Sequence, residues 1–188
     1  MRAATATEKS ANGTEGATRA TRPASVESLV SEVRERARDE WPPRIYRERV
    51  LSMRTRSHAV PAPLKNAKGG VEILHTLLGI ELRVGRRRIS CPDLATARYL
   101  SVFARAGVAE VAVPYDITKI SRLADELESA WQRMLLLADD VTRGRAETVR
   151  SRVRSAVVRE VRREIEEAGA GTPIPQFNQN TRQRPQRI

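Results

Sequence analysis

The stretch that decides the fold runs from position 79 to 116, GIELRVGRRRISCPDLATARYLSVFARAGVAEVAVPYD, and it predicts strand, tight turn, strand, helix, strand. Apolar residues alternate through GIELRV and RRISC, on either side of a two-residue loop at Gly85-Arg86. Glycine first in the loop suits a type II′ turn, which needs a positive φ there. The register gives these apolar facing pairs: Leu82 with Ile89, and Ile80 with Cys91. We therefore expect a β-hairpin with one apolar face.

The helix after the hairpin, LATARYLSVFARAG, has apolar residues on most of its sides, which is typical of a helix buried between layers. Asp93 is its expected N-cap and Gly107 its expected end. EVAVP (110–114) then predicts a third strand. If that strand runs parallel to the second strand of the hairpin, the crossover should be right-handed.

The chain on both sides of this block favours helices. Residues 118–141 carry a heptad-like apolar seam, and residues 145–169 carry a valine-rich stripe beyond a break at Gly144. A short break between two amphipathic helices predicts an antiparallel helical hairpin. Upstream, a helix is expected from 25 to 41, ended by Pro42-Pro43, and a short helix over 71–78, capped by Gly79. RIYRERVLSMRTR (44–56) fits either a short helix or an irregular basic strand.

Together these patterns predict an α+β fold: a small sheet made of the β-hairpin and a third strand, a buried helix, and a C-terminal α-helical hairpin. Residues 1–24 and 169–188 hold little that could form a core, and we expect disordered tails there. A single domain is expected over 25–168.

The composition is strongly basic, with a formal net charge of +11. Segment 43–91 contributes most of it, with eleven basic against three acidic side chains. Such a charge favours polyanionic partners: nucleic acid, an acidic membrane surface or an acidic protein. Thirty of the 34 cationic residues are arginine, which suits bidentate phosphate contacts but is also what a GC-rich genome encodes.

A single cysteine, Cys91, fits a reducing compartment, and its place on the apolar strand face predicts a core residue. No apolar run is as long as a membrane span, and the N-terminus lacks the apolar segment of a secretory signal. We expect a cytoplasmic protein without a membrane partner.

No signature of catalysis, metal binding or cofactor binding is evident, so the prediction leans against an enzyme. His58 and His75 each lack a second ligand at metal spacing. The adjacent carboxylates at 125–126, 139–140 and 166–167 fit solvated helix surfaces. Tyr115-Asp116 fits a functional strand end, or a turn in which Asp116 caps the next helix.

The hairpin has the sharpest electrostatic pattern, because its register sets Arg83 opposite Arg88, with Arg86 and Arg87 at the turn. Like charges opposed on a strand pair repel, and phosphates would relieve that repulsion. An ordinary exposed arginine-rich edge explains the pattern equally well. The predicted nucleic-acid contacts are Arg54, Arg56, Lys65, Lys68, Arg83, Arg86, Arg87 and Arg88.

The sequence thus predicts a non-catalytic nucleic-acid-binding accessory protein, DNA or RNA, that contacts the phosphate backbone. Base stacking has little support, because Trp41, Tyr46 and Tyr115 are the aromatics expected to be available. One alternative is an adaptor or assembly factor that binds an acidic protein or forms a homo-oligomer through the helical hairpin. Another is a winged helix, with helices at 26–41, 44–56 and 65–78 and the hairpin as the wing.

Overall fold

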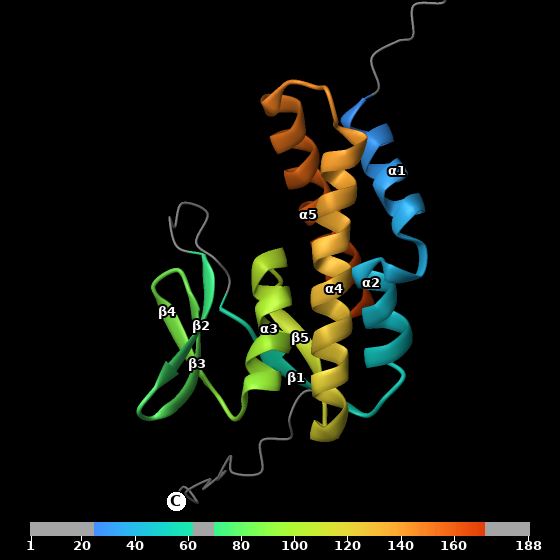
Figure 1. The fold of residues 1–188 in the computed structure, drawn as a ribbon. Helices are drawn as coiled ribbons and strands as arrows, with labels where there is room; N and C mark the ends of the chain where they lie inside the picture. The colour runs from blue at the N-terminus through green and yellow to red at the C-terminus, as the bar shows by residue number, and fades with distance from the viewer. Residues whose placement is uncertain (1–24, 62–69, 172–188) are drawn as a thin grey trace, which may run out of the picture.

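The computed structural model describes residues 25–61 and 70–171. There the chain is α+β, with two small antiparallel sheets beside a group of helices (Figure 1). The α+β class expected from the sequence is confirmed. The elements in chain order are α1 (Val26–Ala37), α2 (Pro42–Ile45), β1 (Thr55–Ala59), β2 (Val71–Thr76), β3 (Gly79–Val84), β4 (Arg87–Cys91), α3 (Leu94–Ala106), β5 (Glu110–Pro114), α4 (Ile117–Val141) and α5 (Glu147–Ala168).

The hairpin formed by β3 and β4 has the predicted register: Leu82 faces Ile89, Ile80 faces Cys91 and Arg83 faces Arg88. Gly85 takes a φ of 62°, which a type II′ turn requires at its first loop position. Leu82 and Cys91 are buried, so the apolar face of the hairpin packs inward as expected.

The helix predicted over 71–78 is wrong, because this segment forms strand β2 and a turn. β2 pairs antiparallel with β3, from Val71 opposite Val84 to Thr76 opposite Gly79. The intrinsic helix preference of a six-residue segment is weak, and here the pairing of a Val/Ile/Leu-rich stretch with β3 outweighs it. The winged-helix alternative is wrong for the same reason, since its third helix included this strand.

The strand predicted at 110–114 exists as β5, but it lies in a different sheet. It pairs antiparallel with β1, from Thr55 opposite Pro114 to Ala59 opposite Glu110. The three-stranded sheet has the order β2-β3-β4, so β2 is the third strand beside the hairpin. Because β5 does not join that sheet, the handedness of a parallel crossover does not arise.

Helix α3 is buried, as predicted, and the three-stranded sheet packs on it (Figure 1). Asp93 caps its start by accepting a hydrogen bond from the Thr96 N–H at 2.7 Å. At its end, Gly107 has a φ of 79°, and Arg162 of α5 donates to the carbonyl of Ala106 at 2.9 Å. A side chain at position 107 would collide with this guanidinium, so glycine serves both the left-handed backbone and the capping contact.

Helices α4 and α5 form the predicted C-terminal pair, and α1 packs beside both of them (Figure 1). The seam of α4 is buried over most of its length, including Leu127 and Met134, while Leu137 and Val141 at its end are partly buried. The seam contacts α1 and α3 as well as α5. The α5 stripe is buried at Val153, Val157, Val161 and Ile165.

The segment that the sequence left open, 44–56, contains helix and strand in succession. Helix α1 ends at Ala37, and a 3-10 turn (Arg38–Glu40) leads to α2. A π-helical turn (Tyr46–Val50) follows α2, and β1 begins at Thr55.

Two tyrosines connect the β1–β5 sheet to the helices. The Tyr46 hydroxyl accepts the N–H of Ala112 at 2.8 Å and donates to the carbonyl of Gly169 at 2.8 Å. The Tyr99 hydroxyl donates to the carbonyl of Ala112 at 2.6 Å. Both backbone polar groups of Ala112 in β5 are therefore satisfied by side chains.

Candidate functional site

The β3–β4 turn projects two adjacent arginines, Arg86 and Arg87, which are exposed. Neither forms an ion pair with a carboxylate in the described part of the chain. The turn conformation comes from Gly85, so the local backbone places these two residues at the end of the hairpin. Two exposed guanidinium groups on adjacent residues can bind an anion such as a phosphate.

The other two arginines of the hairpin, Arg83 and Arg88, have carboxylate partners on neighbouring strands. Arg83 pairs with Glu72 of β2, and the Arg88 guanidinium lies 3.5 Å from Glu81. The repulsion expected between the opposed arginines is therefore compensated within the sheet. A helix over 71–78 would not bring Glu72 beside Arg83, so this ion pair could not be predicted from the sequence.

The guanidinium groups of Arg54 and Arg56 belong to the β1–β5 side of the molecule rather than to the hairpin. Arg54 lies over the ring of Tyr115, 5.1 Å from its centroid. Arg56 lies on β1, and its Nε is buried without a hydrogen-bond partner among the residues that the structure describes. The structure thus does not gather the eight predicted contacts into one patch.

An open groove of about 470 Å³ lies beside the hairpin. Arg87, Arg88 and Ile89 line one side, and Ala59, Val60 and Pro61 line the other. Lys65 and Lys68 lie outside the described residues. The two arginines of β4 therefore face a space that an anionic chain can enter.

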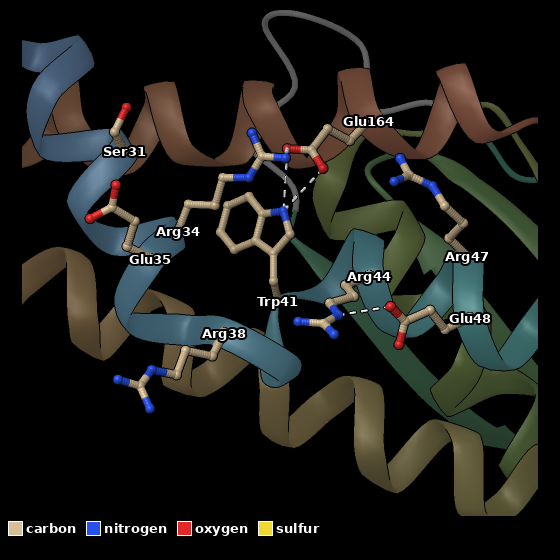
Figure 2. Close-up of a pocket in the computed structure, with 9 residues that line it drawn as sticks. All are labelled: Ser31, Arg34, Glu35, Arg38, Trp41, Arg44, Arg47, Glu48 and Glu164. Atoms are coloured by element: carbon tan, nitrogen blue, oxygen red, sulfur yellow. Dashed lines mark hydrogen bonds and ion pairs between the residues drawn. The ribbon is translucent and has the colours of Figure 1, made fainter.

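A second groove, of about 550 Å³, surrounds Trp41 between α1, α2 and α5 (Figure 2). The indole Nε1 donates to both carboxylate oxygens of Glu164 at 3.3 Å, and a guanidinium nitrogen of Arg34 lies 3.3 Å from the same carboxylate. Glu164 is only 4% exposed, so these two donors compensate a charge that would be costly to bury alone.

The remaining charges of this groove nearly cancel. Arg44 pairs with Asp39 at 2.6 Å and with Glu48 at 2.8 Å. Figure 2 shows Arg38 pointing away from the indole and Arg47 on the far side of Glu164 from Arg34. The Trp41 groove therefore acts as a polar network that joins α1, α2 and α5, and it is a weaker anion site than the turn.

Two of the three aromatics expected to be available for stacking are inside the molecule. Trp41 is 3% exposed and Tyr46 is fully buried, so that expectation is wrong for both. Tyr115 is 44% exposed, with Arg54 over its ring. Burial raises the pKa of Tyr46, and it raises the pKa of Tyr99 still further. These rings form part of the core and contact Phe103.

The adjacent carboxylates at 125–126, 139–140 and 166–167 are mostly ion-paired. Asp125 and Glu126 pair with Arg98 and Arg49, at 2.7 and 2.6 Å. The hydrogen bond from Arg154, 2.6 Å from Nε to Oδ1, lowers the pKa of Asp139. These ion pairs connect one helix or turn to another at the surface of the protein. A structural role therefore explains the adjacent carboxylates.

Asp116 is the N-cap of α4, as one of the two interpretations of Tyr115-Asp116 predicted. Its carboxylate accepts hydrogen bonds from the N–H and the hydroxyl of Thr118, and the latter lowers the pKa of Asp116. Cys91 is buried, as predicted, and burial raises the pKa of its thiol. Among residues 25–61 and 70–171, no His, Cys, Asp and Glu side chains are grouped in a way that could hold a metal ion.

Two exposed leucines at the β2–β3 turn were not predicted from the sequence. Leu77 and Leu78 are 106% and 94% exposed, more than any other large apolar side chain in the described part of the chain. The signal was present in the sequence: VEILHT and GIELRV are two strand-like runs separated by two residues, and glycine follows the loop.

Comparisons of the chain with protein-family models, curated proteins and solved structures find no match. Within the two described segments, no helix has both the length and the apolar character to cross a bilayer.

Proposed function

We propose that the protein is a non-catalytic nucleic-acid-binding accessory protein that contacts the phosphate backbone through the β3–β4 turn. The observation that carries the proposal is the pair of guanidinium groups of Arg86 and Arg87, which are exposed and have no ion-pair partner in the described part of the chain, on a turn ordered by Gly85. The groove beside them, lined by Arg87 and Arg88, gives a phosphate chain a place to lie. The net charge of +11 adds long-range attraction to any polyanion.

Arg83 and Arg88 have a secondary role in this proposal. Their ion pairs with Glu72 and Glu81 are partly exposed. Exposed ion pairs are weak, typically about 0.2–1 kcal/mol, so a phosphate can compete with the carboxylates. Because the carboxylates remain nearby, these two arginines contribute less net attraction than Arg86 and Arg87.

The contact is with the backbone rather than with the bases. Trp41 and Tyr46 are buried, Tyr115 lies next to Arg54 on the other sheet, and residues 71–91 contain neither phenylalanine, tyrosine nor tryptophan, so the hairpin itself offers no ring for stacking. Binding through phosphate contacts alone is largely independent of sequence, and it weakens with salt as condensed counterions are released. Duplex and single-stranded targets are both compatible with this chemistry.

The test is fluorescence anisotropy with a labelled duplex and a labelled single strand at several salt concentrations. For duplex DNA the logarithm of affinity falls with the logarithm of salt concentration by about 0.9 per phosphate neutralised. The double variant Arg86→Gln/Arg87→Gln should therefore make this slope shallower by about two units. Arg83→Gln/Arg88→Gln should change it less.

The matched control is Arg145→Gln/Arg152→Gln, which removes the same charge from two exposed arginines near the start of α5. It should leave the slope nearly unchanged. Equal effects of the two double variants would mean that binding follows net charge alone and would contradict a site at the turn.

The adaptor or assembly role is the second candidate, and the exposed Leu77 and Leu78 favour it. Self-association was expected through the C-terminal helical hairpin, but the α4 seam of that hairpin is largely buried in the monomer. An adaptor therefore would use the leucines rather than the helical hairpin. Binding of nucleic acid that is micromolar or weaker at physiological salt, and indifferent to Arg86 and Arg87, would favour this role.

A further inference from the structure

The edge strands of the two sheets differ in how their unpaired backbone groups are protected. In β5, the polar groups of Ala112 bond to the hydroxyls of Tyr46 and Tyr99. The edge strand β4 carries Arg87 and Arg88, and charged side chains on an edge discourage strand addition. The other edge of the three-stranded sheet is β2, VEILHT, which has neither lysine, arginine nor proline.

The register shows which backbone groups of β2 are free. The two-residue turn and the bond from Gly85 N–H to Gly70 C=O place residues 70, 72, 74 and 76 in hydrogen-bonded pairs with β3. Val71, Ile73 and His75 therefore direct their N–H and C=O groups away from β3. In the described residues no further strand pairs with this edge.

The two exposed leucines lie at the end of the same strand. Thr76 orders their turn, because its hydroxyl accepts from the Leu78 N–H at 3.3 Å and donates to the Gly79 carbonyl at 3.0 Å. Burying a leucine side chain stabilises by about 1.5–3 kcal/mol, so an ordered turn that exposes two of them indicates a surface that is covered in an assembly.

We propose that a second copy of the chain pairs antiparallel with β2 along this edge, giving a closed two-fold dimer with one continuous six-stranded sheet. The register centred on Leu74 matches the free groups: Ile73 bonds to His75 of the second copy, and Val71 to its Leu77. This register covers each leucine turn with the start of the other copy's β2. Glu72 falls opposite Thr76 of the second copy, so no like charges are opposed.

The charges along β2 permit a second copy there, and the charges along β4 limit the assembly to two chains. The carboxylate of Glu72 is already paired with Arg83 of its own sheet, so two β2 edges meet without strong repulsion. The outer edges of the joined sheet are then the two β4 strands, whose arginines oppose further addition. An isologous interface of this kind closes with two-fold symmetry.

The sharpest test is disulfide trapping with Leu74→Cys in the full chain. At the centre of the proposed register the two Leu74 residues form a non-hydrogen-bonded pair, with Cα atoms about 4.5 Å apart, within disulfide range. Mild oxidation should give a covalent dimer on a non-reducing gel, because native Cys91 is buried and does not compete. Ser90→Cys, exposed on the β4 edge, is the matched control and should cross-link at least tenfold more slowly.

The unmodified chain should show twice its 21.0 kDa mass by light scattering at micromolar concentration. Ile73→Pro removes an outward N–H without breaking the β2–β3 ladder, so it should give a folded monomer, whereas Ser90→Pro should leave the dimer intact. Leu77→Ser/Leu78→Ser should weaken dimerisation about tenfold or more. A monomer at every concentration, or equal cross-linking of the two cysteine variants, would overturn the proposal.

Discussion

The Tyr46 hydroxyl forms two hydrogen bonds with the backbone at the same time. It accepts from the N–H of Ala112 in β5 and donates to the carbonyl of Gly169, just after α5. Ala112 is fully buried, so its N–H has no access to water once that hydroxyl is removed. Leaving a buried polar group unsatisfied costs about 1–3 kcal/mol.

Tyr46→Phe should therefore lower the free energy of unfolding by about 2 kcal/mol, measured by urea denaturation. Tyr99→Phe is the natural comparison, because it removes only the donor to the Ala112 carbonyl and should cost about 1 kcal/mol. A Tyr46 variant as stable as the parent would mean that water reaches Ala112 from the β5 edge.

At the residue scale, the sequence predicted interactions that lie within a few positions of one another. The caps at Asp93 and Asp116, the turn at Gly85 and the helix end at Gly107 all depend on local backbone geometry, and all are confirmed. Side-chain partners that are distant in the chain were not predictable. The pairing of Trp41 with Glu164 depends on how α5 packs, and no local pattern encodes that contact.

At the scale of an element, helix α4 shows that a long periodic pattern of apolar residues is enough to predict a helix. Its apolar seam was predictable because the repeat runs along nearly the whole of a 25-residue helix, which is long enough for the periodicity to be unambiguous. Strand β2 is six residues long, and so short an apolar run fits a helix or a strand equally well. Its identity was decided by β3 pairing with it, which is a tertiary effect.

Leu127→Asp should destabilise the protein by several kcal/mol, because Leu127 is fully buried on the face of α4, a helix that packs against α1, α3 and α5. Leu136→Asp is the matched control: Leu136 belongs to the same helix but is 68% exposed, and its variant should stay within about 0.5 kcal/mol of the parent. Thermal melting followed by circular dichroism measures both. Similar melting temperatures for the two variants would mean that the seam is open in solution.

The contact between α4 and α5 at Asp139 and Arg154 should depend on pH. Arg154 lowers the pKa of Asp139, mainly by hydrogen bonding, so the pair stabilises the fold above the ordinary aspartate pKa. That contribution is lost as pH falls from about 4 through the lowered pKa of the folded state. The pair is partly exposed, so its contribution is about 0.2–1 kcal/mol.

Arg154→Gln should accordingly be less stable than the parent at pH 7 and nearly equal to it at about pH 2, in urea denaturation at both values. Arg152→Gln, on the same helix and exposed, should show no such convergence. A stability difference for Arg154→Gln that persists unchanged in acid would assign the effect to helix propensity rather than to the ion pair.

At the scale of the whole molecule, the α+β class was predictable because it follows from the sum of the local patterns. The division of the strands into two sheets was not, because β1 precedes β5 by about fifty residues and neither strand signals its partner. The candidate site was predicted in part. Arg86 and Arg87 lie at the hairpin turn, exposed and without an ion pair among the described residues, but Arg54 and Arg56 lie with the other sheet.

The two sheets should differ in stability against local unfolding. The main contacts of the three-stranded sheet are with α3, whereas β5 lies among buried side chains and is bonded by two tyrosines. Native-state hydrogen exchange should therefore show faster exchange in β2–β4 than in β5 and α3. The measurement should be made at protein concentrations below those at which the chain dimerises. Equal protection of the amides in both sheets would contradict the expectation that the three-stranded sheet unfolds locally on its own.

The distribution of tryptophan has a practical consequence for spectroscopy. Both tryptophans, Trp41 and Trp131, lie in the helical part of the molecule, and residues 71–91 contain neither phenylalanine, tyrosine nor tryptophan. Intrinsic fluorescence therefore does not report directly on the three-stranded sheet, whereas far-ultraviolet circular dichroism detects the whole backbone. If the sheet melts first, the two probes will give different midpoints, and a stability taken from fluorescence alone will describe only the helices.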